Sequence, residues 1–270
     1  PGVLNVVTGL GERAGAALAA HPGVDKIAFT GSTEVGKLML EAARGNLKKL
    51  TLELGGKSPA IVLPDADLEL TIPGVANAIF FNSGQVCVAG SRLYVHEKIF
   101  DRVLEGVVAY ARGIRLGHGL DPATQMGPVV SRKQADRIAG YIASGKQEGA
   151  SVVAGGGQTG PAGTFIEPTV LVDVRPQMKV VREEIFGPVL CIARVDDYAG
   201  AVRLINAHEF GNGTSIFTQD GGIARDFAHR IQIGMVGINV PIPVPMAFHS
   251  FGGWKSSLFG DHHVHGPEGV

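Results

Sequence analysis

Residues 26–54 read KIAFTGSTEVGKLMLEAARGNLKKLTLEL, and this stretch decides the fold class. An apolar run at residues 26–29 is followed by a helical pattern at residues 33–43 and by a second apolar run at residues 50–54. A strand, a helix and a second strand in this order predict a right-handed, parallel βαβ unit. The chain is therefore expected to be an α/β protein.

The alternation of strands and helices continues on both sides of this unit. Residues 4–7 predict an earlier strand and residues 12–20 an Ala-rich helix. Gly55 and Gly56 interrupt the pattern, and a second α/β unit is expected after them. Its strands are expected at residues 60–63, 92–95 and 151–153 and near Val170, Leu190 and Ser215, and its helices at residues 66–81, 98–112 and 132–148 and near Ala201 and Ala224.

The composition excludes several classes of function. The net charge of −1 and the lack of a basic stripe argue against nucleic acid and anionic membranes as partners. No apolar run reaches the ~18 residues that a membrane span needs. With only two cysteines among 270 residues, a disulfide framework is not expected, and the cytoplasm, a reducing compartment, is the predicted location.

The turn Thr30-Gly31-Ser32-Thr33 is a candidate phosphate-binding element. It follows a strand and opens a helix, where exposed backbone N–H groups attract anions, and Ser32 offers a hydroxyl. The alternative is an ordinary capped helix. Taken alone, the turn does not decide between the two.

Glu53 and Cys87 are the candidate catalytic residues. Glu53 lies in an apolar strand before two glycines, where a carboxylate has a raised pKa that suits a general base. Cys87 follows a Ser-Gly turn, and a thiol presented there can attack a carbonyl. The alternatives are a strand residue paired with Lys48 and a buried structural cysteine. Cys191 lies in an apolar strand and is expected to be inert.

Five motifs in this order resemble the aldehyde dehydrogenase superfamily. They are FTGST at residues 29–33, LELGGK at residues 52–57, GQVC at residues 84–87, EIFGP at residues 184–188 and FGGWK at residues 251–255. The spacing of Glu53 and Cys87 also fits the family. The resemblance covers the chain from residue 1 to its end. The three histidines His262, His263 and His265 lie near the end of the sequence. No cysteine or carboxylate cluster accompanies them at the spacing of metal ligands, so no metal site is expected.

The resemblance implies a domain organisation. Residues 1–55 are expected to be the remnant of a Rossmann-type NAD(P)-binding domain and residues 56–256 an α/β catalytic domain. Residues 257–270 would form a tail that returns toward the cofactor and oligomerisation region of a homodimer or homotetramer. The family's fold begins before Pro1, so the isolated chain is expected to be inactive or nearly so.

The resemblance also implies a reaction on a small-molecule aldehyde with NAD or NADP. Cys87 attacks the aldehyde to form a thiohemiacetal, hydride passes to the nicotinamide, and Glu53 activates the water that hydrolyses the resulting thioester. The residues implied to bind the cofactor are Gly31, Ser32, Leu54, Glu184 and Phe186, and those implied to line the aldehyde channel are Asn239 and Phe251.

Two alternatives stay open. Residues 237–263 resemble methylmalonate-semialdehyde dehydrogenases, which pass the acyl group to coenzyme A, and those enzymes lack a glutamate at the position of Glu53. A glutamate at this position favours water as the acyl acceptor. The other alternative is a non-catalytic scaffold subunit that keeps the fold without turnover. The sequence does not identify the aldehyde, and it does not separate NAD from NADP.

Overall fold

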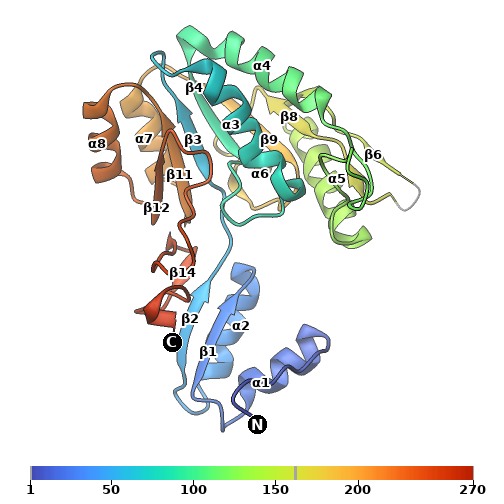
Figure 1. The fold of residues 1–270 in the computed structure, drawn as a ribbon, viewed down its shortest axis with the longest axis vertical. Coiled ribbons are helices and arrows are strands. Elements are labelled where there is room, and N and C mark those ends of the chain that lie inside the picture. Colours follow the sequence, from blue (N-terminus) through green and yellow to red (C-terminus); the bar gives the residue numbers. More distant parts are fainter. Residues whose placement is uncertain (1, 161–162, 270) are drawn as a thin grey trace. The chain divides into compact units, whose positions relative to one another are not determined.

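The computed structural model describes residues 2–160 and 163–269 (Figure 1). The chain forms two compact units, one made of Pro1–Gly55 with Pro245–Val270 and the other of Gly56–Val244. The first boundary lies at the glycine pair where the sequence pattern is interrupted. Residues 245–256 belong to the first unit, whereas the family resemblance implied that they belong to the catalytic domain.

The first unit is built on the expected βαβ element. Strand β1 (Lys26–Thr30) pairs in parallel with β2 (Lys49–Glu53), and α2 (Thr33–Ala43) connects them. Strand β14 (Leu258–Phe259) joins β2 in antiparallel orientation, with Leu258 opposite Glu53. This pairing explains why the C-terminal segment belongs to the first unit. The remaining elements of this unit are the π-helical turn η1 (Gly11–Gly15), α1 (Ala16–Ala20), β13 (Trp254–Lys255) and η4 (Pro267–Gly269).

The prediction of a strand at residues 4–7 is wrong. These residues form no strand in the structure, and Leu4, Val6 and Val7 are 87%, 82% and 67% exposed. A short apolar run becomes a strand only when a neighbouring strand accepts its hydrogen bonds and covers its side chains. Neither is provided to residues 4–7 by the part of the chain that the structure describes.

The second unit contains a seven-stranded sheet in the order β12-β11-β3-β4-β9-β8-β5. Neighbouring strands pair in parallel, except that β5 runs antiparallel to β8. The strands are β3 (Pro59–Val62), β4 (Arg92–His96), β5 (Ser151–Ala154), β8 (Thr169–Val172), β9 (Val189–Val195), β11 (Gly213–Phe217) and β12 (Met235–Ile238). Short strands β6 (Gln158–Thr159) and β7 (Phe165–Ile166) form a separate hairpin, and β10 (Phe210–Gly211) precedes β11.

Helices cover both faces of this sheet (Figure 1). They are α3 (Leu68–Phe80), α4 (Phe100–Gly113), α5 (Arg132–Gln147), α6 (Lys179–Arg182), α7 (Tyr198–Asn206) and α8 (Gly221–Arg230), with short helical turns η2 (Phe81–Gly84) and η3 (Glu97–Ile99). Successive side chains of β3 point to opposite faces of the sheet. Val62 therefore packs with apolar residues of α3 and α4 on one face, and Ile61 packs with those of α7 and α8 on the other. The expected α/β fold is confirmed.

Among the described residues, no helix combines the length and the apolar character needed to cross a membrane.

Candidate active site

Cys87 lies in a loop that several side chains hold in place. The turn η2, which precedes Cys87, contains three consecutive residues with positive φ: Asn82 at 50°, Ser83 at 55° and Gly84 at 69°. The Ser83 hydroxyl donates to the carbonyl of Gly127 at 2.8 Å. Left-handed backbone at non-glycine residues is strained and persists only where the surroundings hold it. Cys87 follows this turn, is partly exposed and forms no disulfide.

Two glycines allow the backbone of neighbouring segments to approach the Cys87 loop. A Cβ atom at Gly56 would collide with the carbonyl oxygen of Cys87, and one at Gly84 would collide with the carbonyl of Gly187. The sequence therefore needs glycine at both positions for reasons of space. These contacts place Gly56 against the backbone of Cys87, and Gly187 against Gly84, three residues before Cys87.

The Glu184 carboxylate is hydrogen-bonded to Gly56, the residue that lies against the Cys87 backbone. The backbone N–H of Gly56 donates to Glu184 Oε1 at 2.8 Å. Burial raises the pKa of Glu184, while this hydrogen bond acts in the opposite direction. The structure thus brings Cys87 and Glu184 together through Gly56, as the resemblance implied for residues of one site.

Phe186 has a positive φ of 58° and a side chain that is 38% exposed. Helix α5 holds this turn, because the Gln134 side-chain amide donates to the carbonyls of Ile185 at 3.0 Å and Phe186 at 2.9 Å. Gln134 was not identified from the sequence, since no motif surrounds it, and in the structure it is half-buried on α5. Its hydrogen bond to Phe186 joins two residues that are 52 positions apart in the sequence.

Lys57 is a second residue that the sequence analysis did not assign. It is 1% exposed, and its Nζ has no hydrogen-bond partner among the described residues. Burial lowers the pKa of Lys57 to about 8, and the nearby Glu184 partly opposes this shift. The signal in the sequence was a lysine within an apolar, glycine-rich motif. Lys57 therefore places a buried amino group within electrostatic range of the Glu184 carboxylate.

Replacing Gly56 by alanine should disturb the Cys87 loop. The added methyl group has no room beside the Cys87 carbonyl, so the backbone must shift, at a cost of about 1–3 kcal/mol in the free energy of unfolding. Denaturant unfolding measures the cost, and the rate of Cys87 alkylation by iodoacetamide should change with it. Gly140→Ala is the matched control, because a Cβ atom there meets open space. Equal stability and alkylation rate in the two variants would contradict the role of Gly56.

Glu53 lies at the end of β2 in the first unit. It is 7% exposed, and burial raises its pKa to about 7, while a hydrogen bond from the backbone of Gly253 lowers it. A Cβ atom at Gly252 would collide with Glu53 Oε1, so the loop at residues 251–253 lies directly against the carboxylate. The contact with Glu53 thus explains why residue 252 is a glycine. Phe251 is half-buried and stacks on His265, with ring centroids 4.2 Å apart.

The turn between β1 and α2 also lies beside Glu53. The Gly31 N–H donates to the Glu53 carbonyl at 3.0 Å. Ser32 caps α2, because its hydroxyl oxygen accepts from the Val35 N–H at 3.2 Å. Leu54 is buried against α2, and a Cβ atom at Gly36 would collide with its side chain. In the first unit the structure therefore brings together Gly31, Ser32, Glu53 and Leu54.

Asn239 has a clear structural contact. Its side-chain amide accepts from the Thr218 N–H at 3.0 Å and donates to the Thr218 carbonyl at 2.9 Å, with a φ of 56°. These bonds join the chain after β12 to the chain after β11. A role of Asn239 in lining an aldehyde channel stays a prediction.

The comparisons with known proteins identify the family. The model of the aldehyde dehydrogenase family matches residues 1–270, and the chain belongs to this family. It is 46% identical over 258 residues to the mitochondrial aldehyde dehydrogenase of Equus caballus, covering 95% of this chain and 51% of that protein. The chain spans about half the length of the curated relatives it matches.

Solved structures give the same fold. The NAD+ complex of an aldehyde dehydrogenase from Bacillus cereus superposes with a TM-score of 0.91 at 42% identity, covering 94% of this chain and 52% of that chain. The methylmalonate-semialdehyde dehydrogenase DddC from Oceanimonas doudoroffii superposes with a TM-score of 0.90 at 40% identity, covering 93% and 53%. The chain is thus similar in fold both to an aldehyde dehydrogenase and to a methylmalonate-semialdehyde dehydrogenase.

Proposed function

We propose that this protein oxidises an aldehyde to a carboxylic acid, with NAD or NADP as the electron acceptor. The observation that carries the proposal is Cys87 itself. Cys87 is a partly exposed cysteine that follows a strained turn, and its backbone carbonyl lies against Gly56, whose N–H donates to Glu184. In a chain of this family these features favour a nucleophile. Buried structural cysteines such as Cys191 have none of these features.

The first unit fits the phosphates of a dinucleotide. The Ser32 hydroxyl accepts from Val35 and so retains its own hydrogen for a phosphate oxygen at the N-terminus of α2, an 11-residue helix. The similar Bacillus cereus enzyme is solved with NAD+. We assign Gly31, Ser32 and Leu54 to cofactor binding in the first unit, and Glu184 and Phe186 in the second. When bound, the nicotinamide supplies the acceptor for the two electrons that leave the aldehyde carbon.

In the proposed mechanism, Cys87 forms the covalent intermediate. Its thiolate attacks the aldehyde carbon, a carbon–sulfur bond forms, and the carbonyl electron pair moves to the oxygen. The Cys87 backbone N–H is the candidate donor to this oxyanion. After oxidation the acyl group remains on Cys87 as a thioester, which a second nucleophile must release.

Glu53 is proposed to activate that second nucleophile. With a pKa of about 7, the carboxylate can take a proton from water near neutral pH, and hydroxide attack releases the carboxylic acid and the Cys87 thiolate. Transfer to coenzyme A is the second candidate, favoured by the resemblance of residues 237–263 and by the similarity to DddC. A thiol needs less help from a base than water does, so Glu53 favours hydrolysis.

Product analysis of the purified full-length protein tests this function. With short-chain aldehydes and NAD+ or NADP+, we expect free carboxylic acid at full rate without coenzyme A. Acyl-CoA as the main product would replace hydrolysis by the second candidate, and no aldehyde consumption with either cofactor would reject both. Assembly as a homodimer or homotetramer and a cytoplasmic location complete the proposal by resemblance to the family.

Replacing Gly31 by valine should weaken binding of NAD(P)+ roughly tenfold or more. A Cβ atom at Gly31 would collide with the Phe29 ring, so the branched side chain must displace the turn that precedes α2. Calorimetric titration of the full-length protein with NAD+ and NADP+ measures the change. Gly45→Val serves as the control, because a Cβ atom there has nothing closer than the Ala42 carbonyl at 4.0 Å. Unchanged affinity in a folded Gly31→Val variant would refute the assignment of this turn.

A further inference from the structure

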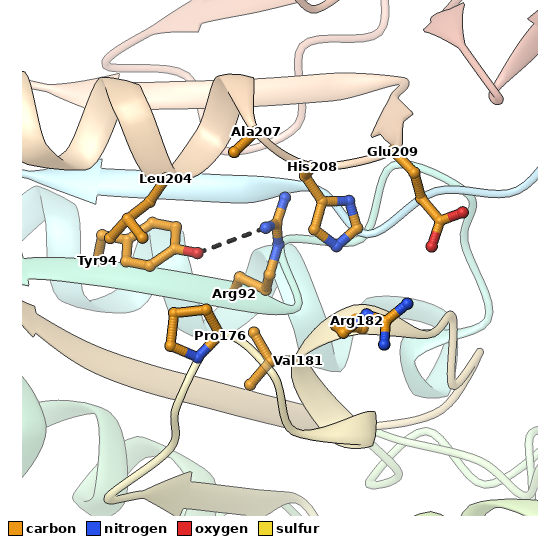
Figure 2. Close-up of a pocket in the computed structure, with 9 residues that line it drawn as sticks. All are labelled: Arg92, Tyr94, Pro176, Val181, Arg182, Leu204, Ala207, His208 and Glu209. Carbon is orange, nitrogen blue, oxygen red and sulfur yellow. Dashed lines mark hydrogen bonds between the residues drawn. The ribbon is translucent and has the colours of Figure 1, made fainter.

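A pocket in the second unit belongs to none of the functions described above. It lies over β4, between the segment around α6 and the C-terminal end of α7 (Figure 2). Its volume is about 320 Å³. Neither Cys87 nor Glu184 lines it, so a ligand bound there would be separate from the proposed reaction.

Arg92 provides the charge of this pocket. It is 2% exposed, and its guanidinium lies between the rings of Tyr94 and His208 (Figure 2). Nε donates to the Lys57 carbonyl at 2.7 Å and Nη1 to the Tyr94 hydroxyl at 3.4 Å, whereas Nη2 has no partner. Arg92 pairs with no carboxylate among residues 2–160 and 163–269. A buried guanidinium without a counter-charge is unfavourable, and an anion would offset that cost.

The walls and the mouth of the pocket restrict the kind of anion. Pro176, Val181, Leu204 and Ala207 give it an apolar wall. Arg182 and Glu209 are both exposed at the mouth, and in the described structure they form no ion pair with each other. Glu209 disfavours a second negative charge on the ligand, and the apolar wall favours a hydrocarbon chain. These features suit a monoanion with a short alkyl chain better than phosphate.

We propose that this pocket binds a short-chain monocarboxylate, with the carboxylate directed to Arg92 and the alkyl chain against Leu204 and Val181. A pocket of about 320 Å³ is large enough for a ligand of a few carbon atoms. Arg92 Nη2 is buried beside the His208 ring, so direct contact with the carboxylate requires a small movement of that ring. The proposal does not depend on the proposed dehydrogenase function.

Calorimetric titration of the 270-residue chain with butyrate at constant ionic strength tests the proposal. We expect saturable binding of one butyrate per chain and none of butylamine, which has the same alkyl chain and the opposite charge. Ala207→Phe should abolish binding by filling the pocket from its wall. Arg182→Glu should weaken it about fivefold, whereas Arg102→Glu, an exposed charge reversal on α4, should leave it within twofold.

Three results would overturn the inference. If binding of butyrate to the wild-type chain does not saturate, the chain has no specific site for it. Butyrate that binds equally to folded Ala207→Phe and Arg182→Glu variants would place the site elsewhere. Inorganic phosphate that binds as tightly as butyrate would show a general anion site instead of a carboxylate site. Because none of these measurements uses turnover, they are independent of whether the protein oxidises aldehydes.

Discussion

Replacing Cys87 by alanine should abolish aldehyde oxidation by the full-length protein, with a loss of about 10⁴-fold or more in turnover. The proposed reaction proceeds through a bond between the Cys87 sulfur and the aldehyde carbon, and an alanine methyl group cannot form that bond. Steady-state formation of reduced cofactor, with cofactor affinity measured separately, gives the size of the effect. Binding of NAD(P)+ should persist, because the nucleotide contacts proposed for the first unit are unchanged.

Cys191→Ala is the matched control for this experiment. Cys191 lies in β9, is 2% exposed, and contacts the Val180 carbonyl through its sulfur at 3.4 Å. Burial raises the pKa of its thiol, so little thiolate is available. Its replacement should leave turnover within a few-fold of the wild type. An equal loss of activity in both variants would remove Cys87 from the role of nucleophile.

Glu53→Gln should lower steady-state turnover by about 10²–10⁴-fold while leaving the first oxidation intact. The amide cannot accept a proton from water, so the thioester on Cys87 should accumulate. Rapid mixing should therefore show one burst of reduced cofactor per active site, followed by a slow phase. Glu41→Gln, at an exposed position of α2, removes a carboxylate without touching the proposed site.

The pH dependence follows from the raised pKa of Glu53. Burial moves the pKa from 4.5 to about 7, so the proton-accepting carboxylate becomes more abundant as pH rises through 7. Turnover limited by hydrolysis should therefore increase about tenfold from pH 6 to pH 8 and then level off. Glu53→Gln should lose this dependence. If the wild type and Glu53→Gln have the same pH profile, Glu53 is not the general base. The same conclusion follows if acyl-CoA forms at the same rate in both proteins.

Local patterns predicted the secondary structure of this chain well. The helix expected at residues 33–43 is α2 (Thr33–Ala43), which Ser32 caps and which buries Gly36 and Ala43. The helix expected at residues 132–148 is α5 (Arg132–Gln147), capped by Ser131. These features depend on residues three or four positions apart, which a sequence displays directly. The run at residues 4–7 failed because a strand also needs a partner.

The candidate site divides in the same way. The motifs around Glu53 and Cys87 identified the family and the candidate nucleophile and base, because each motif consists of a few neighbouring residues that the sequence shows directly. The sequence carried no signal for Gln134, and for Lys57 it showed only the place of a lysine in a glycine-rich motif. Gln134 donates to the carbonyl of Phe186, and Lys57 interacts electrostatically with Glu184, so both roles depend on distant segments of the chain.

The sequence by itself determined the α/β class, most of its elements, the family and the residues proposed for the chemistry. Only the tertiary structure decided which charges are buried and what faces them. The pKa of Glu53 is raised because the chain at residues 252–253 covers its carboxylate, and Arg92 lacks a counter-charge because α6 and α7 enclose it with mainly apolar side chains. Desolvation depends on every atom that displaces water around a group, and those atoms come from segments far apart in the chain.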